Sequence, residues 1–349
     1  VAPASVAKIT TAAAALAALG PDARITTRVV AGSTPGDVVL VGGGDPTLSI
    51  NARQAYPGAA RLDLLAKAVR AAYGQAVRRV IVDGSAFSGP TTGPGWDSDI
   101  VSAGFAAPVT ALMVDGGRIN PLRDRRSTAP DLAAGQAFAR LLGAPATAVI
   151  RGRAPAGGNV LARVSSAPMS RLIEQMLGPS DNVVAEALIR QVAIASKAPA
   201  DFTNATAAVR ATLSRIGVDV SGLRLADGSG LSRLNRLSPA LVTSLLTAAA
   251  SGTHPELRPL LAGLPVAGFS GTLNERYRIA ASRPGAGVVR AKTGSLSGVS
   301  TLAGVVRDTD GRLLAFAVLA DEVRPGGIFA AEAALDRIAA TLARCGCQG

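Results

Sequence analysis

The sequence predicts an α+β protein in which an antiparallel sheet edged by helices is accompanied by a smaller, separate α/β module. Three observations predict this class. Strand-like and helical runs alternate over residues 26–85, and helical patterns dominate from 168 to 250. Two apolar runs then flank the turn residues 309–311, ahead of a helical pattern over 328–344. Strands and helices grouped in this way are typical of α+β folds.

The start of the chain is expected to form a helix. The segment that ends at Leu19 is rich in Ala, Pro3 suits a first helical turn, and Gly20 suits a C-terminal cap. Side chains three positions apart are neighbours on a helix, so Ser5 and Lys8 should lie side by side. This places a nucleophile next to a base, at a helix end whose free N–H groups can stabilise an oxyanion.

The remaining elements are predicted from apolar periodicity and from turn residues. Paired strands are expected over 26–32 and 37–44, followed by an amphipathic helix over 61–74 and a strand over 77–85. The further expected elements are a helix over 132–142, a strand over 148–152, helices within 168–196, 203–216 and 238–250, a strand over 287–295, a hairpin at 309–311 and a terminal helix over 328–344.

Two later motifs change how the Ser/Lys pair is interpreted. An S-D-N motif lies at a Gly-Pro turn at 180–182, and a K-T-G motif ends a strand-like run at 292–294. S-x-x-K, S-D-N and K-T-G in this order are the signature of penicillin-binding proteins and class A β-lactamases. Only four of the 36 Lys and Arg residues are Lys, and two of these four fall in the motifs. Lysine can lose its proton when buried, whereas arginine effectively cannot.

Lys8 has to be deprotonated to act as a base. Its pKa must therefore fall by about 3 units from an ordinary value of about 10.4. We expect burial to lower this pKa, helped by the positive charge of Lys292.

Other catalytic chemistries are poorly supported. His254 is the only histidine, stands before a proline and is more typical of a loop or helix start than of a Ser-His-Asp triad, and there is no G-x-S-x-G motif. The run ending at Lys292 lacks the glycines of a phosphate-binding loop. A protein zinc site is not expected, because the chain has one His and two closely spaced Cys, Cys345 and Cys347. No cofactor is expected either. For the two cysteines, a local disulfide, an intermolecular bond and free thiols all stay open.

The net charge of +12 does not by itself indicate nucleic-acid binding. The arginines are dispersed, and the densest cluster, Arg123, Arg125 and Arg126, has no flanking aromatic residues to stack on bases. Attraction to an anionic cell envelope and plain solubilisation fit equally well. No apolar run reaches the length of a membrane span, and no export signal begins the chain. The start at Val1, so close to Ser5, favours a removed export signal over a cytosolic protein.

The sequence resembles the class C low-molecular-mass penicillin-binding proteins, the D-alanyl-D-alanine carboxypeptidase/endopeptidase family, over nearly its whole length. Beyond the three motifs, the resemblance rests on VGGGDPTLS, DGSGLSRLNRLSP, LPVAGFSGTL and KTGSLSGVSTLAG. It implies a transpeptidase/β-lactamase-like catalytic domain formed by 1–28 and 164–349, with an inserted smaller α/β domain at 29–163. The family also has strands and a helix before its S-x-x-K helix, so this chain should be a fragment or lack a sheet edge.

The resemblance further implies what the insert lacks. Only 175 positions separate the serines of the first two motifs, which is short for this family. The nested domain that the insert usually carries should therefore be missing. We expect a short loop at 120–130 in its place.

The resemblance assigns a role to each motif residue. Ser5 is expected to be the acylated nucleophile and Lys8 its base. Ser180 would relay a proton, Asn182 would hold the substrate amide, and Lys292 would supply positive potential.

The segment after Lys292 is expected to bind the substrate. Thr293 and Ser295, on either side of Gly294, would bind the terminal carboxylate of D-alanine. The backbone N–H groups of Ser5 and Ser295 would form the oxyanion hole.

A pocket for the substrate side chain is implied by two further residues. Arg233 and Asp99 match family positions where a carboxylate can pair with the free amine of a diamino acid. Asp97 is a rival for Asp99, because the local spacing differs from the family pattern. A plain surface ion pair is the alternative interpretation.

The function implied is that of a serine D,D-peptidase acting on peptidoglycan stem peptides outside the cytoplasm. Ser5 would attack the D-Ala-D-Ala terminus, or a D-Ala–diamino acid cross-link, and β-lactam antibiotics would acylate the same serine. A β-lactamase or esterase on the same scaffold is the first alternative, although no deacylating Glu is identifiable. The second is a non-catalytic basic protein that binds the cell envelope.

Overall fold

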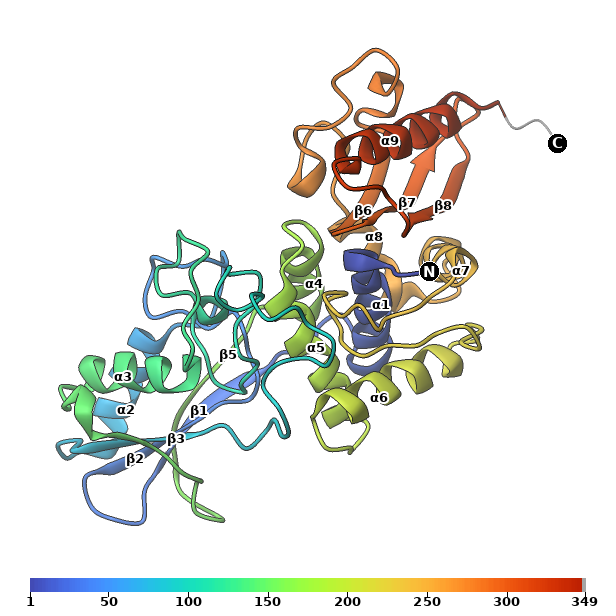
Figure 1. Cartoon of the computed structure of the whole chain (residues 1–349). Helices are drawn as coiled ribbons and strands as arrows, with labels where there is room; N and C mark the ends of the chain where they lie inside the picture. The colour runs from blue at the N-terminus through green and yellow to red at the C-terminus, as the bar shows by residue number, and fades with distance from the viewer. Residues whose placement is uncertain (347–349) are drawn as a thin grey trace.

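A computed structural model describes residues 1–346 of the chain. Two separate sheets flank a group of helices, and the chain leaves this helical group for a small lobe before it returns (Figure 1). The small lobe consists of the five-stranded sheet with helices α2 (Leu62–Tyr73) and α3 (Pro130–Leu142). The predicted α+β class is confirmed. Cys347, whose state the sequence left open, lies outside the described residues.

The small lobe contains the predicted alternation of strands and helices. Its strand order is β4-β3-β2-β1-β5, with β2, β3 and β4 parallel to one another. Helices α2 and α3 form the connections between these parallel strands, as parallel pairing requires. The elements are β1 (Thr26–Ala31), β2 (Asp37–Val41), α2 (Leu62–Tyr73), β3 (Arg79–Asp83), α3 (Pro130–Leu142), β4 (Val149–Arg151) and β5 (Val160–Ser165).

The core of the small lobe lies between the sheet and its two helices. Leu65 and Val69 of α2 and Phe138 of α3 pack with Leu40 and Val82 of the sheet, and all five are buried. Every residue of β2 is buried, which is the pattern expected for a strand covered on both faces.

Strand β5 was not predicted from the sequence. It pairs antiparallel with β1, with Thr26 opposite Ser165, so it forms one edge of the sheet. All six of its residues are exposed or half-buried, so no fully buried apolar face marks it. Backbone pairing with β1, which no local pattern reveals, makes this segment a strand. The short helix α8 (Arg258–Gly263) was missed as well.

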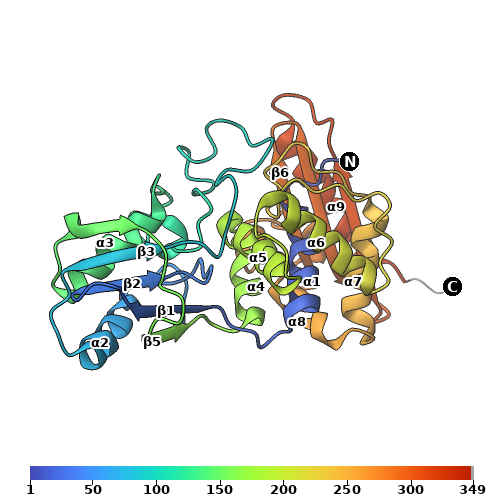
Figure 2. The same ribbon diagram turned by 90° about the horizontal axis from the view of Figure 1, so that it is seen from below.

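The helical group is built around α1 (Lys8–Leu19), which is buried from Lys8 to Leu16. Figure 2 shows α1 among the other helices of this group. The alanines at positions 12–15 are fully buried, and their small side chains let neighbouring helices approach closely. The surrounding helices are α4 (Met169–Leu177), α5 (Asn182–Ala195), α6 (Phe202–Arg215), α7 (Pro239–Ser251) and α8.

The second sheet has the order β6-β7-β8 and is antiparallel throughout. It consists of β6 (Val289–Leu296), β7 (Val299–Arg307) and β8 (Leu313–Ala320), and α9 (Ile328–Arg344) packs against it. The predicted turn between β7 and β8 is present, with Gly311 at a φ of 81° that favours glycine. Strand β6 carries the K-T-G motif and approaches the start of α1, where the N-terminus also lies (Figure 1).

The first and last strands of the small lobe, β1 and β5, mark where the chain enters and leaves it. Both predicted domain boundaries, at 28/29 and 163/164, fall inside strands, because β1 begins at Thr26 and β5 ends at Ser165. Residues 120–130 contain a loop that ends where α3 begins, and the N–H of Ile119 donates to the carbonyl of Arg125 across it. The number of domains remains a prediction. No helix within residues 1–346 is long and apolar enough to cross a membrane.

A glycine at the centre of the second sheet should tolerate no side chain. A Cβ on Gly304 would lie 2.0 Å from the carbonyl oxygen of Arg290 in β6, so β6 and β7 would have to separate. We expect Gly304→Ala to lower the free energy of unfolding by at least about 3 kcal/mol, at the upper end of overpacking effects. Urea denaturation measures this change. Gly222→Ala, where a Cβ meets nothing within 4 Å, is the control and should change stability little.

Candidate active site

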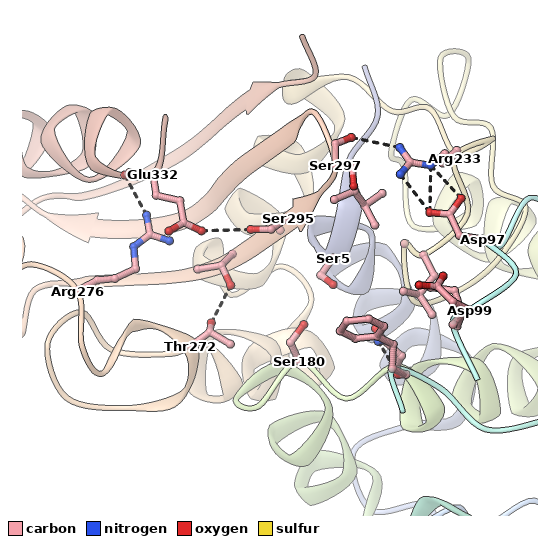
Figure 3. A pocket seen from close by; sticks show the side chains of 18 residues that line it. Ser5, Asp97, Asp99, Ser180, Arg233, Thr272, Arg276, Ser295, Ser297 and Glu332 are labelled. Atoms are coloured by element: carbon pink, nitrogen blue, oxygen red, sulfur yellow. Dashed lines mark hydrogen bonds and ion pairs between the residues drawn. The ribbon is translucent and has the colours of Figure 1, made fainter. Parts of the chain in front are cut away.

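A cavity of about 650 Å³ lies where the helical group, the second sheet and a loop of the small lobe meet (Figure 3). Its lining includes residues from all three sequence motifs. It also includes residues that the motifs did not indicate, among them Thr272, Arg276 and Glu332. The predicted site residues that line it are Ser5, Asp99, Ser180, Asn182, Arg233, Thr293, Gly294 and Ser295.

Ser5 lies on a single turn of 3-10 helix, η1 (Ala4–Ala7), that leads into α1. The sequence predicted one continuous α-helix here, so the local geometry is tighter than expected. Ala4 has a φ of 45°, an uncommon value for a residue with a side chain. A Cβ on Gly230 would lie 1.9 Å from the Ala4 carbonyl oxygen, and one on Gly294 would lie 2.9 Å from the Ser5 nitrogen. The motif glycine therefore lets β6 approach the backbone of Ser5.

Lys8 lies next to Ser5, as the spacing predicted. Its Nζ is 2.9 Å from Ser5 Oγ, 2.6 Å from Asn182 Oδ1 and 2.7 Å from the carbonyl oxygen of Ser229. The last two atoms can only accept hydrogen bonds, so they fix two N–H groups of the amine. In the neutral amine, the lone pair is then left for the Ser5 hydroxyl. Lys8 is fully buried, and this geometry suits proton transfer from Ser5 to Lys8.

The pKa of Lys8 is lowered to about 8 by burial. The nearby carboxylates of Asp227, Glu186 and Asp181 oppose this effect and keep the pKa above neutrality. The expected lowering of this pKa by Lys292 is wrong, because burial causes the decrease, and the repulsion between the two lysines lowers the pKa of Lys292 instead. Burial, and then the charge of Lys8, hold the pKa of Lys292 well below its ordinary value.

The carbonyl of Ser229 is fixed by a buried polar loop that the sequence analysis did not interpret chemically. Asp227 accepts hydrogen bonds from the N–H groups of Gly230, at 2.9 Å, and Ser232, at 2.7 Å. Trp96 Nε1 also donates to Asp227, at 2.8 Å. The DGSGLSRLN stretch therefore folds around one carboxylate and presents a backbone acceptor to Lys8.

The S-D-N motif begins α5. Asn182 accepts from Lys8 and donates from Nδ2 to the carbonyl of Phe105, at 2.9 Å, so it links the base to a loop of the small-lobe region. Ser180 lines the cavity and has a φ of 63°, a backbone conformation that a residue with a side chain rarely adopts. Its predicted role as a proton relay remains a prediction.

Asp181 is held by the small-lobe region. Its Oδ1 accepts from the N–H groups of Val183 and Val184 and so caps α5. Its Oδ2 lies 2.7 Å from the hydroxyl of Tyr56 and 3.2 Å from Arg118 Nη2. We call Asp181, Tyr56, Arg118 and Arg126 the clamp.

The clamp is largely buried and sets two arginines against one carboxylate. Arg126 Nη2 lies 3.9 Å from Asp181 Oδ2, and its Nη1 donates to the carbonyl of Gly116, at 2.6 Å. Burial alone would raise the pKa of Asp181, but the charges of Arg126 and Arg118 bring it below its usual value. Arg126, which belongs to the densest cluster of arginines in the sequence, is only 8% exposed. Its charge belongs to the clamp and not to the surface.

The K-T-G strand forms the opposite wall. Lys292 is fully buried, and its Nζ donates to the carbonyl of Thr293 at 2.8 Å. Thr293 Oγ1 in turn donates to Thr272 Oγ1, at 2.7 Å. Ser295 Oγ donates to Glu332 Oε1 of α9, at 3.2 Å. The two hydroxyls predicted to bind a carboxylate are thus both present, and one of them faces an acid.

Arg233 pairs with Asp97, at 3.1 Å, and not with Asp99. Its Nη1 also donates to the carbonyl of Ser297, at 3.2 Å (Figure 3). Asp97 and Asp99 both line the cavity. Of the two candidates, only Asp97 makes the ion pair with Arg233.

Comparison with known proteins gives consistent results. A model of the D-Ala-D-Ala carboxypeptidase 3 (S13) family matches residues 1–125 and 122–342. Carboxypeptidase DacB of Mycolicibacterium smegmatis is 47% identical over 353 residues, which cover 99% of this chain and 76% of that protein. The D-alanyl-D-alanine carboxypeptidase of an Actinomadura species is 31% identical over 405 residues, covering 91% of this chain and 72% of that protein.

A solved structure also matches the whole fold. The crystal structure of penicillin binding protein 4 from Haemophilus influenzae superposes with a TM-score of 0.83 at 26% identity, covering 99% of this chain and 92% of that one. A predatory peptidoglycan endopeptidase from Bdellovibrio bacteriovorus has the same fold at 17% identity, with a TM-score of 0.58. This superposition covers 97% of this chain and 85% of the endopeptidase chain.

The clamp should support both folding and reactivity. We expect Tyr56→Phe to lower the free energy of unfolding by about 1.5–3 kcal/mol, because a hydrogen bond to a charged group is lost. Reaction with a fluorescent penicillin should slow as well, since Asp181 lies between two cavity residues. Urea denaturation and labelling rates measure the two effects. Tyr73→Phe removes a hydroxyl that donates to the Asp37 carbonyl in the small lobe, and it should leave labelling unchanged. Equal labelling of both variants would contradict a positioning role for the clamp.

Proposed function

Because this chain belongs to the D-Ala-D-Ala carboxypeptidase 3 (S13) family, we propose that it is a serine D,D-peptidase that acts through an acyl-enzyme on Ser5. One observation carries the assignment of the nucleophile. Lys8 Nζ lies 2.9 Å from Ser5 Oγ, while Asn182 and Ser229 hold the rest of the amine in place. A serine hydroxyl next to a buried amine of lowered pKa is an activated nucleophile.

The proposed reaction is hydrolysis of the D-Ala-D-Ala terminus of a peptidoglycan stem peptide. Ser5 Oγ attacks the carbonyl of the penultimate D-alanine and its proton passes to Lys8. The proton is then delivered to the leaving nitrogen, D-alanine departs, and water hydrolyses the ester on Ser5. Ser180, which lines the same cavity, is the proposed relay for that proton. A D-Ala–diamino acid cross-link contains the same acyl group and would be cleaved in the same way.

The remaining residues are proposed to hold the substrate. Asn182 would hold the substrate amide, and Thr293 and Ser295 the terminal carboxyl group, all from positions on the cavity wall. Arg233 and its partner Asp97 would line the pocket for the stem side chain, with Asp99 beside them.

The site of action follows from the proposed substrate. Peptidoglycan lies outside the cytoplasmic membrane, so we propose an extracytoplasmic location. The net charge of +12 supports an additional electrostatic association with an anionic envelope. The domain arrangement that we propose is a catalytic unit interrupted by the small lobe, from Thr26 to Ser165.

Labelling by a penicillin distinguishes the proposed peptidase from a β-lactamase and from a non-catalytic envelope-binding protein. A β-lactamase needs a group that activates the deacylating water, and the three acids buried near Lys8 are engaged elsewhere. Glu186 accepts from the N–H groups of Gly228 and Ser229, Asp227 from its own loop, and Asp181 from Tyr56 and Arg118. We therefore expect stable labelling by a penicillin, as for a peptidase. Rapid turnover of the label would support a β-lactamase, and absence of labelling would support a non-catalytic envelope-binding protein.

The nucleophile can be identified directly. We expect intact-mass spectrometry after incubation with a penicillin to show one adduct, and peptide mapping to place it on Ser5. Ser5→Ala should lose the adduct while the protein stays folded, since Ser5 is only half-buried and its hydroxyl accepts a single hydrogen bond, from Lys8. An adduct on another serine, with Ser5 free, would overturn the assignment.

The base is tested by removing its ability to take a proton. Lys8→Arg keeps the positive charge, but arginine cannot accept the Ser5 proton near neutral pH, so acylation should fall at least about a hundredfold. In the unmodified protein, acylation should speed up as pH rises through about 8 and then level off, because the neutral amine is the active form. Stopped-flow labelling measures both. Lys67→Arg and Lys197→Arg, at exposed positions outside the cavity, are the controls. Normal acylation by Lys8→Arg would mean that the base lies elsewhere.

A further inference from the structure

Glu186 is a fully buried acid behind the catalytic pair, and the proposed reaction does not use it. It lies on α5, four positions after Asn182. Its Oε1 accepts hydrogen bonds from the N–H groups of Gly228, at 3.1 Å, and Ser229, at 2.8 Å. The carbonyl of Ser229 in turn accepts from Lys8 Nζ, at 2.7 Å. A single residue, Ser229, therefore connects the carboxylate of Glu186 to the amine of Lys8.

Two acids hold the loop that carries this carbonyl. Its N–H groups at 228, 229, 230 and 232 all donate to Glu186 or to Asp227. Hydrogen bonds to an ionised acceptor are stronger than those between neutral groups, so the loop is fixed on both sides. A Cβ on Gly228 would lie 3.0 Å from the carbonyl oxygen of Ala185, so the loop packs directly on α5. The direction of the Ser229 carbonyl thus depends on the helix that carries Glu186.

The charge of Glu186 is only partly offset by its own helix. Arg190 Nη1 lies 3.8 Å from Glu186 Oε2 and donates to the backbone carbonyl of Glu186, at 3.1 Å. The guanidinium of Arg190 also lies over the ring of Phe202, with its Cζ 4.0 Å from the ring centroid. Burial, and then the charge of Asp227, raise the pKa of Glu186. A carboxylate in these surroundings favours a positive charge on a nearby amine.

The charged groups that act on Lys8 come from several elements. They are three acids and, through mutual repulsion, one lysine: Asp227, Glu186, Asp181 and Lys292. Among the acids, Glu186 accepts from the N–H of Ser229, whereas Asp227 accepts from its hydroxyl, at 3.4 Å, and Asp181 belongs to the clamp. Glu186 is therefore placed to act on Lys8 both by its charge and through the carbonyl of Ser229.

We propose that Glu186 is a positioning residue of the reaction: it holds the carbonyl that receives one N–H of Lys8, and its negative charge keeps a proton on that amine until the pH rises above neutrality. The proposal rests on the function proposed above. The held carbonyl fixes where the lone pair of the neutral amine points. The charge sets the pH at which this lone pair becomes available to Ser5. The two effects are separable, because one depends on the position of an oxygen and the other on its charge.

Two variants separate position from charge. Glu186→Gln keeps an oxygen that can accept from both N–H groups but removes the negative charge. We expect the midpoint of the pH profile for acylation by a fluorescent penicillin to move at least about half a unit to lower pH, with less than about a threefold change in the rate at high pH. Glu186→Asp keeps the charge but draws the oxygens back by one methylene. It should lower the rate at high pH about tenfold or more, because the amine is no longer held in line with Ser5.

Asp37→Asn is the matched control. Asp37 is a buried acid at the start of β2 that pairs with Arg79, so this variant also leaves an arginine without its carboxylate. Asp37 lies in the small lobe, does not line the cavity and is not among the acids that act on Lys8. Its pH profile should equal that of the unmodified protein. A merely structural Glu186 would also leave the midpoint in place, and its removal would lower the rate equally at every pH.

Each result decides the proposal. An unchanged midpoint in Glu186→Gln, or an unchanged rate at high pH in Glu186→Asp, would overturn it. Thermal melting shows whether the variants are folded. Glu186→Asp leaves Arg190 its counter-charge, so it still decides the proposal if Glu186→Gln does not fold. Failure of a penicillin to label the unmodified protein at any pH would instead contradict the proposed function. Normal labelling with both profiles unchanged would retain that function and reject the role of Glu186.

Discussion

The buried amine of Lys8 is the constraint on which the rest of the site depends. An amine taken out of water is costly unless its hydrogen bonds are satisfied, and here Ser5, Asn182 and Ser229 each supply one. Each comes from a different part of the chain: the turn before α1, the start of α5 and the loop at 227–232. Packing α1 at the centre of the helical group brings these parts together. The Ala-rich composition of α1 is therefore also a condition for the chemistry.

The small lobe contributes to the site by holding the segment 180–182 in place. Asp181 separates Ser180 from Asn182 along the chain, and Tyr56 and Arg118 fix it from the small-lobe region. The strained backbone at Ser180 is a conformation that needs such support from its surroundings. The carboxylate of Asp181 also acts on Lys8, whose pKa it raises. The clamp thus links the small lobe to both the geometry and the protonation of the site.

Features that depend on residues close together in the sequence could be predicted from the sequence. The pairing of Ser5 with Lys8 and the helix that carries them depend on positions three apart, which local periodicity reveals. Asn182 and the K-T-G strand could be placed because their motif is chemically distinctive. Tyr56, Arg118 and Glu332 could not, since each meets its partner across a large gap in sequence and belongs to no motif. Strand β5 could not be predicted for a related reason: it is a strand because it pairs with β1, which is distant in the sequence.

The two motif lysines restrict the charge that the cleft can carry. Both are fully buried, and the charge of Lys8 lowers the pKa of Lys292. Protonation of one therefore opposes protonation of the other. Acids next to Lys8 favour its charged form, whereas burial and Lys8 itself are the causes that act on Lys292. Lys292 is expected from the resemblance to supply positive potential, and this role stays a prediction. Its Nζ donates to the carbonyl of Thr293 and so fixes the strand along which the substrate would lie.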